Sequence, residues 1–121
     1  MASPFDPLTS LQYSEDELRA AAEEATNYGT YATIHAHMDE SVSRAIDVGF
    51  KMIEHATVMS EETAKKMGEK GVIWSMQTGL FMPDAETNPA YSNDKQRAKF
   101  CEYFELSSKE YRPGAETDQL K

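Results

Sequence analysis

The 121-residue sequence is poor in cysteine, in basic residues and in long apolar runs, and each shortage excludes a class of protein. Its single cysteine, Cys101, excludes an internal disulfide framework and favours a reducing compartment, so we expect a cytoplasmic location. Only 12 Lys and Arg stand against 21 Asp and Glu, and a net charge of −9 argues against nucleic-acid binding and against docking on anionic membranes. No apolar run approaches the roughly 20 residues of a transmembrane helix. The length suits one domain with a hydrophobic core.

Residues 14–76 alternate helical patterns with short apolar runs. Ser14 and Glu17 have the spacing of a capping box, and Gly29, Gly49 and Gly71 stand where the three predicted helices end. Since helices and strands alternate at a repeat of about 20 residues, we expect a parallel sheet with helices packed against it. The predicted elements are a helix from residue 14, a strand at 31–36, a helix at 39–48, a strand at 50–54, a helix from residue 60 and a strand at 72–76.

The other segments have different patterns. Residues 1–13 are expected to form a loop or arm, 77–93 a proline-containing loop, 94–108 a helix and 109–121 a polar tail. Nothing in the sequence is expected to cover the edges of a three-stranded sheet. We therefore predict either a segment of a larger barrel or self-association through bare sheet edges.

All three histidines lie within residues 31–55. His35 and His55 close successive predicted strands, so both should lie at the carboxyl edge of the sheet, where α/β proteins assemble active sites. Neutral imidazole is a common zinc ligand, but a histidine at a strand end also serves as a polar residue bonded to backbone, and the residues alone leave both interpretations open. His37 is two residues after His35, so on a continuing strand its side chain would point the same way as that of His35. The alternative is that His37 lies past the strand end and contacts substrate.

Three other residues receive structural interpretations. Glu54 precedes His55 on a strand, so the two should face opposite ways, which makes Glu54 a helix-side residue or an outer partner of the site. Asp39 is expected to cap the helix at 39–48. Cys101 is expected to pack in a buried position rather than act as a nucleophile.

Residues 14–78 resemble the amidohydrolase superfamily, specifically its imidazolonepropionase-like and prolidase-like metal-dependent hydrolases. The matching motifs are IHAH at 34–37, the helix SVSRAIDVGF, and then IEHA at 53–56 followed by another helix and strand. This resemblance implies an α/β fold, a partial (β/α)₈ TIM barrel, in which the chain is a fragment covering about strands five to seven.

The resemblance also implies a site. In that family the histidines that end the fifth and sixth strands bind metal, and His35 and His55 match them, while His37 matches a position that suits a substrate contact. The cofactor that the resemblance implies is a divalent metal, with zinc expected, and one or two ions in the full-length family. The expected chemistry is hydrolysis of an amide, lactam or dipeptide carbon–nitrogen bond by a metal-activated hydroxide.

The chain also departs from the family pattern. The HxH pair of the first strand, the bridging lysine of the fourth and the aspartate base of the eighth have no counterparts, and Ala56 stands where glycine is usual. We therefore assign no catalytic residue and expect the chain to be inactive by itself. The alternative function is a non-catalytic half-barrel, a binding or assembly module that pairs with a partner or with itself.

Overall fold

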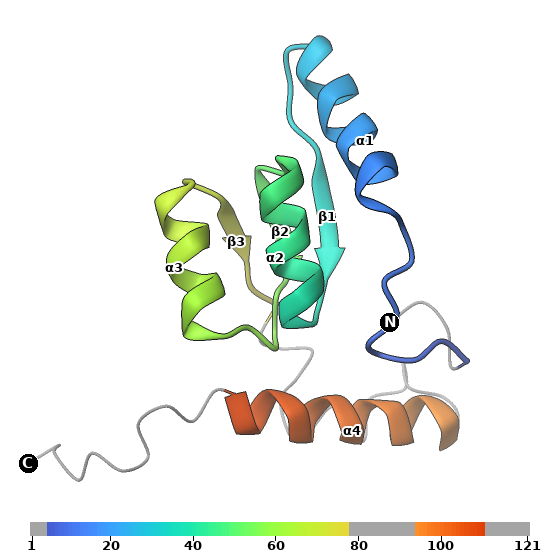
Figure 1. Cartoon of the computed structure of the whole chain (residues 1–121). Helices are drawn as coiled ribbons and strands as arrows, with labels where there is room; N and C mark the ends of the chain where they lie inside the picture. Colours follow the sequence, from blue (N-terminus) through green and yellow to red (C-terminus); the bar gives the residue numbers. More distant parts are fainter. Residues whose placement is uncertain (1–4, 78–93, 111–121) are drawn as a thin grey trace, which may run out of the picture.

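A three-stranded parallel sheet with helices against one face forms the body of the protein (Figure 1). The computed structural model describes residues 5–77 and 94–110. Its strands pair in the order β1–β2–β3, so the predicted alternation of helices and parallel strands is confirmed. The elements are α1 (Glu15–Asn27), β1 (Thr33–Ala36), α2 (Asp39–Val48), β2 (Met52–His55), α3 (Glu61–Glu69), β3 (Ile73–Ser75) and α4 (Asp94–Glu110).

The strands are shorter than predicted, and β2 starts later and extends through His55. Helix α4 begins as expected and continues to Glu110. The expected loop and polar tail fall largely on residues 78–93 and 111–121, outside the described residues.

Helix α1 begins with the predicted capping box. The Ser14 hydroxyl accepts a hydrogen bond from the Glu17 backbone N–H at 3.3 Å, and the Glu17 carboxylate accepts one from the Ser14 backbone N–H at 2.9 Å. This second bond lowers the pKa of Glu17, since it favours the charged carboxylate. The two bonds satisfy backbone donors that the first helical turn would otherwise leave without partners.

Helix α2 ends at Gly49, whose φ of 105° lies in the left-handed region. There the Phe50 backbone N–H donates to the Ala45 carbonyl at 3.1 Å, and the chain turns back toward β2. Glycine suits this position because it has no Cβ to clash at positive φ.

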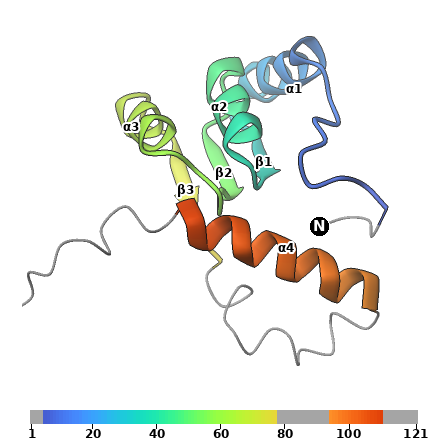
Figure 2. The same cartoon turned by 60° about the horizontal axis from the view of Figure 1, so that its bottom comes forward.

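The hydrophobic core lies between the sheet and helices α1 to α3, which cover the same face (Figure 2). Ile46 of α2 and Ile53 of β2 are at its centre, 2% and 0% exposed, with Val42 fully buried beside them. Burying each such side chain stabilises the fold by about 1.5–3 kcal/mol. The core therefore fixes β1 and β2 relative to α2, and with them the strand ends that carry the histidines.

The opposite face of the sheet has no helix over it among the described elements (Figure 2). Ile73 of β3 lies on this open face, since its neighbour Trp74 pairs with the core residue Ile53, and Ile73 is 52% exposed. No helix within residues 5–77 and 94–110 is long and apolar enough to cross a membrane.

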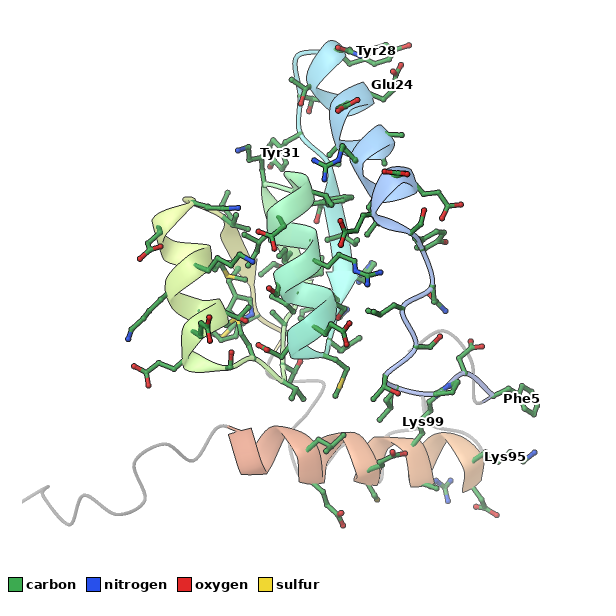
Figure 3. The ribbon with its side chains drawn as sticks, viewed as in Figure 1. Phe5, Glu24, Tyr28, Tyr31, Lys95 and Lys99 are labelled. Atoms are coloured by element: carbon green, nitrogen blue, oxygen red, sulfur yellow. The ribbon has the colours of Figure 1, made fainter. Side chains whose placement is uncertain are left out.

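Helix α4 lies beyond the carboxyl ends of the strands, next to the N-terminal arm formed by residues 5–13 (Figure 1). The Lys99 ammonium donates to the Asp6 carbonyl, and the Lys95 ammonium lies 4.9 Å from the centre of the Phe5 ring (Figure 3). Cys101 is exposed on this helix, so the prediction of a buried packing role is wrong.

Candidate metal centre

Two imidazoles converge at the carboxyl edge of β1 and β2. Nδ1 of His35 and Nε2 of His55 are 2.8 Å apart, and the ring centroids are 4.9 Å apart. The core positions both strand ends, because Ala36 and Ile53 are buried beside the two histidines. The structure thus brings together the two residues that the sequence places at neighbouring strand ends.

The convergence depends on an unusual backbone at the end of β2. Pairing sets His35 opposite Glu54 and Ala36 opposite His55, so simple alternation would turn His55 toward the helices with Ile53. Instead His55 has φ 75° and Ala56 has φ 43°, both left-handed. Each such residue costs roughly 1–2 kcal/mol unless glycine occupies it. This turn, which includes Ala56, carries the His55 ring to the side of His35.

Backbone hydrogen bonds continue past the strand ends and join the two loops. The N–H of Ala56 donates to the Ala36 carbonyl at 2.8 Å, and the N–H of Val58 donates to the His37 carbonyl at 2.9 Å. One step further, the Ser60 N–H donates to Asp39 Oδ1 at 2.7 Å. These three bonds tie together the loops that follow His35 and His55.

Asp39 therefore has a different role from the predicted helix cap. The N-cap position of α2 is Met38, which makes no side-chain capping bond, and Asp39 is the first helical residue. Its carboxylate accepts a bond from the start of the next helix because the two βα loops lie side by side.

His37 lies one residue beyond β1 and stacks on His55, with centroids 4.3 Å apart and planes 13° from parallel. Burial, followed by the neighbouring His55, lowers the pKa of His37 to about 3. Burial also lowers the pKa of His55, with His35 adding to the effect. Both rings are therefore neutral near pH 7, the state in which imidazole binds a metal.

Glu54 lies on the open face of the sheet, so its predicted helix-side placement is wrong. It pairs with His35 on one side and Ser75 on the other, while Ile53 faces the helices. A hydrogen bond from Ser75 is the main cause of its lowered pKa, and Gln77 Nε2 also donates to the carboxylate at 3.1 Å. Glu54 is thus an anionic neighbour of the two imidazoles, in keeping with the expectation of an outer partner.

A cavity of about 640 Å³ opens beside the histidines. The N-terminal arm, the end of β1, the start of α2 and Lys99 of α4 form its walls, and all three histidines line it. Arg44 fastens the arm to α2 by donating to the Tyr13 carbonyl at 3.2 Å. The sequence predicted an arm but not that the arm would line a cavity. The contact that holds the arm in place is a side-chain hydrogen bond to a backbone carbonyl, and such a bond has no recognisable sequence pattern.

The two converging imidazoles fit part of a metal site. In a tetrahedral zinc site with Zn–N distances of about 2.0–2.1 Å, two ligand nitrogens lie about 3.3 Å apart, so a small outward rotation of the rings would admit an ion between them. A catalytic zinc site uses about three protein ligands. Within the described part of the chain no group of three His, Cys, Asp or Glu could hold a metal. His35 and His55 would therefore supply two ligands of a larger set.

Comparison with known proteins places this arrangement in context. No family model matches the chain. Ochratoxinase from Aspergillus niger is 33% identical over 63 residues, covering 52% of this chain. The solved structure of a prolidase complexed with N-methylphosphonate-L-proline is 31% identical with a TM-score of 0.79, covering 89% of this chain and 27% of that one. An amidohydrolase structure is also 31% identical, with a TM-score of 0.68, covering 78% of this chain and 23% of that one.

The chain belongs to the amidohydrolase superfamily. The resemblance drawn from the IHAH and IEHA motifs is confirmed, and the three parallel strands with their helices form part of the family's TIM barrel. The chain spans 13% of the length of ochratoxinase and 27% of the prolidase chain. Most of an amidohydrolase barrel therefore lies outside the region that this chain matches.

Proposed function

We propose that this chain carries two metal ligands, His35 and His55, of an enzyme that hydrolyses carbon–nitrogen bonds in small amides, lactams or dipeptides. The observation that carries the proposal is the 2.8 Å approach of their ring nitrogens at the carboxyl edge of the sheet. The similar prolidase binds a phosphonate derivative of proline, which supports a dipeptide-like substrate. The single cysteine supports action in a reducing compartment such as the cytoplasm.

A divalent metal, for which we propose zinc, would polarise a substrate carbonyl and lower the pKa of water. This chain's residues have distinct parts in that chemistry. His35 and the neutral His55 would hold the ion. His37 lies in the cavity wall and stacks on His55, and from there it would contact substrate. The cavity volume of about 640 Å³ is in the range of small-molecule sites.

Zinc competition against a chromophoric chelator tests the ligand assignment. We expect one zinc ion per wild-type chain and a loss of affinity exceeding about 100-fold in both His35→Ala and His55→Ala, since ligands contribute more than their outer partners. His37→Phe is the matched control, because it keeps a ring stacked on His55 and should leave zinc affinity unchanged. Wild-type affinity in both alanine variants would overturn the assignment.

Hydrolysis is measured as release of free amine from Xaa-Pro dipeptides and N-acyl amino acids, with zinc and after chelation. Two ligands do not complete a catalytic zinc site, so we expect little turnover by this chain alone. Any turnover should require zinc and disappear in the two alanine variants. Turnover that survives in both would contradict the proposed chemistry.

The open face of the sheet favours the second function, an assembly module. Ile73 is 52% exposed on β3, an outer strand of the described sheet, and bare apolar strands promote association. Sedimentation should then show a concentration-dependent dimer that Ile73→Lys shifts to monomer. Tyr28→Lys is the matched control, because Tyr28 is 81% exposed at the end of α1, away from the sheet. A monomeric wild type would exclude this function for the chain alone.

A further inference from the structure

One side chain outside the histidine cluster contacts the strained end of β2. Nε1 of Trp74 donates a hydrogen bond to the carbonyl oxygen of His55 at 2.7 Å. The bond reaches the backbone of the residue that departs from ordinary strand geometry, with φ 75°. Trp74 thus acts on the His55 backbone, two positions beyond Ile53, its own pairing partner.

The surroundings of Trp74 make it a rigid donor. It belongs to β3, is half-buried and packs against the hydrophobic core that contains Ile53. A large aromatic ring held by a core has few alternative rotamers, so its N–H is directed at a fixed point. That point is the carbonyl whose orientation changes if His55 returns to an extended conformation.

A second bond acts on the same peptide unit. The N–H of Ala56 donates to the Ala36 carbonyl at 2.8 Å, which ties the other side of the turn to β1. The His55 carbonyl and the Ala56 N–H belong to the same peptide unit. Trp74 and Ala36 therefore hold this unit from β3 and from β1, and its orientation sets the direction of the His55 ring toward His35.

We propose that Trp74 is a positioning residue of the two-histidine site, whose indole N–H holds the His55 peptide in the left-handed turn that directs His55 toward His35. The inference rests on the proposed function, because its consequence is metal affinity. Trp74 would act through His55 and would not touch the metal. Outer partners that orient metal ligands typically contribute 10–100-fold to affinity.

The test is zinc affinity of the full 121-residue chain carrying Trp74→Phe, which removes the N–H and keeps an aromatic ring. We expect zinc to bind at least about tenfold more weakly than to wild type. Val48→Ala is the matched control: Val48 is buried in α2 and is not part of the histidine turn, so its loss should reduce stability and leave zinc affinity unchanged. Unchanged affinity in folded Trp74→Phe would overturn the inference. Equal losses of affinity in the two variants would also overturn it.

A second readout needs no substitution at Trp74. The chain has one tryptophan, so its indole N–H gives one resonance in a ¹H–¹⁵N spectrum. We expect zinc to shift that resonance in wild type and not in His55→Ala. A resonance that zinc at saturation leaves unmoved would contradict the inference while zinc binding itself upholds the proposed function. If wild type binds no zinc, the proposed function fails first and the inference fails with it.

Discussion

At the scale of single residues, His55 combines a strained backbone with a functional position. Its φ of 75° would be costly in an ordinary strand, and the buried Ala56 adds a second left-handed residue at φ 43°. Strain of this kind persists only where surrounding contacts compensate for it, and it is common at binding sites. Here the compensating contacts come from Trp74 on β3 and from Ala36 on β1.

The Asp39 carboxylate also links the loop after β1 to the loop after β2. Asp39→Ala removes the acceptor of the Ser60 N–H, a part-buried bond of 2.7 Å, and should lower the free energy of unfolding by about 1–3 kcal/mol. Asp39→Asn keeps a side-chain oxygen and should cost less than half as much. Urea denaturation of the three proteins measures the difference. Equal stability of Asp39→Ala and wild type would show that the link does not stabilise the fold.

The sequence located the histidines but not the direction of their side chains. With the pairing register of the structure, ordinary strand alternation would turn His55 away from His35, and the left-handed backbone at the strand end turns it back. The Trp74 bond joins residues 19 apart and leaves no local pattern, so only the structure could reveal it.

At the scale of elements, α2 and α3 are joined by an ion cluster on the outer surface. Asp47 of α2 accepts from the ammonium groups of Lys66 at 2.5 Å and Lys70 at 3.1 Å, while Lys66 also donates to Ser43 at 3.0 Å. The bonds from Lys66 and then Lys70 lower the pKa of Asp47 below its ordinary value of 3.8. Since these groups are substantially exposed, solvent screening limits what the cluster contributes.

The pH dependence of this cluster can be measured. A carboxyl whose pKa is lower in the folded state stabilises the fold above its unfolded pKa and loses that contribution as the pH falls through the folded pKa. The stability difference between wild type and Asp47→Asn should be about 0.5–1 kcal/mol at neutral pH. It should decline once the pH falls below 3.8. Denaturation across this range measures it, and a difference independent of pH would contradict the ion-pair account.

Two glycines offer a matched comparison of helix endings and helix interiors. Gly49 has φ 105° at the end of α2, so Gly49→Ala should lower stability by about 1–2 kcal/mol through backbone strain. Gly68 lies inside α3, and Gly68→Ala should raise stability by about 0.5–1 kcal/mol. A Cβ added at either position meets no atom within 4 Å, so steric clashes do not contribute to the difference in stability between the two variants. Thermal unfolding measures both, and shifts of the same sign would contradict the prediction.

The order of helices and strands was the part of the fold most accessible from sequence. Ser14, Ser60 and the glycines at 49 and 71 mark helix limits through local backbone chemistry, and the structure has helices there. Strand limits were less accurate, since pairing between strands decides them. The burial of Cys101 was predicted wrongly, because a helical pattern alone does not show which face of α4 is covered.

At the scale of the whole molecule, the three-stranded sheet is part of a TIM barrel, and the histidines lie at the carboxyl edge of that part. Helices α1 to α3 cover one face (Figure 2). The pairing register puts Glu54 and the exposed Ile73 on the other face. In the similar prolidase, this chain matches 27% of the length. The structure therefore brings together the two residues that we propose as ligands, and the proposed catalysis needs groups beyond those that it describes.

The most direct test of the central claim is a long-range ¹H–¹⁵N spectrum of the histidine rings, recorded with and without zinc. The chain has three histidines, so each ring nitrogen can be assigned with the single-histidine variants. Nδ1 of His35 and Nε2 of His55 face each other at 2.8 Å, so these two nitrogens should move to zinc-bound shifts while neither His37 nitrogen does. Zinc-bound shifts at His37, or at neither facing nitrogen, would contradict the account.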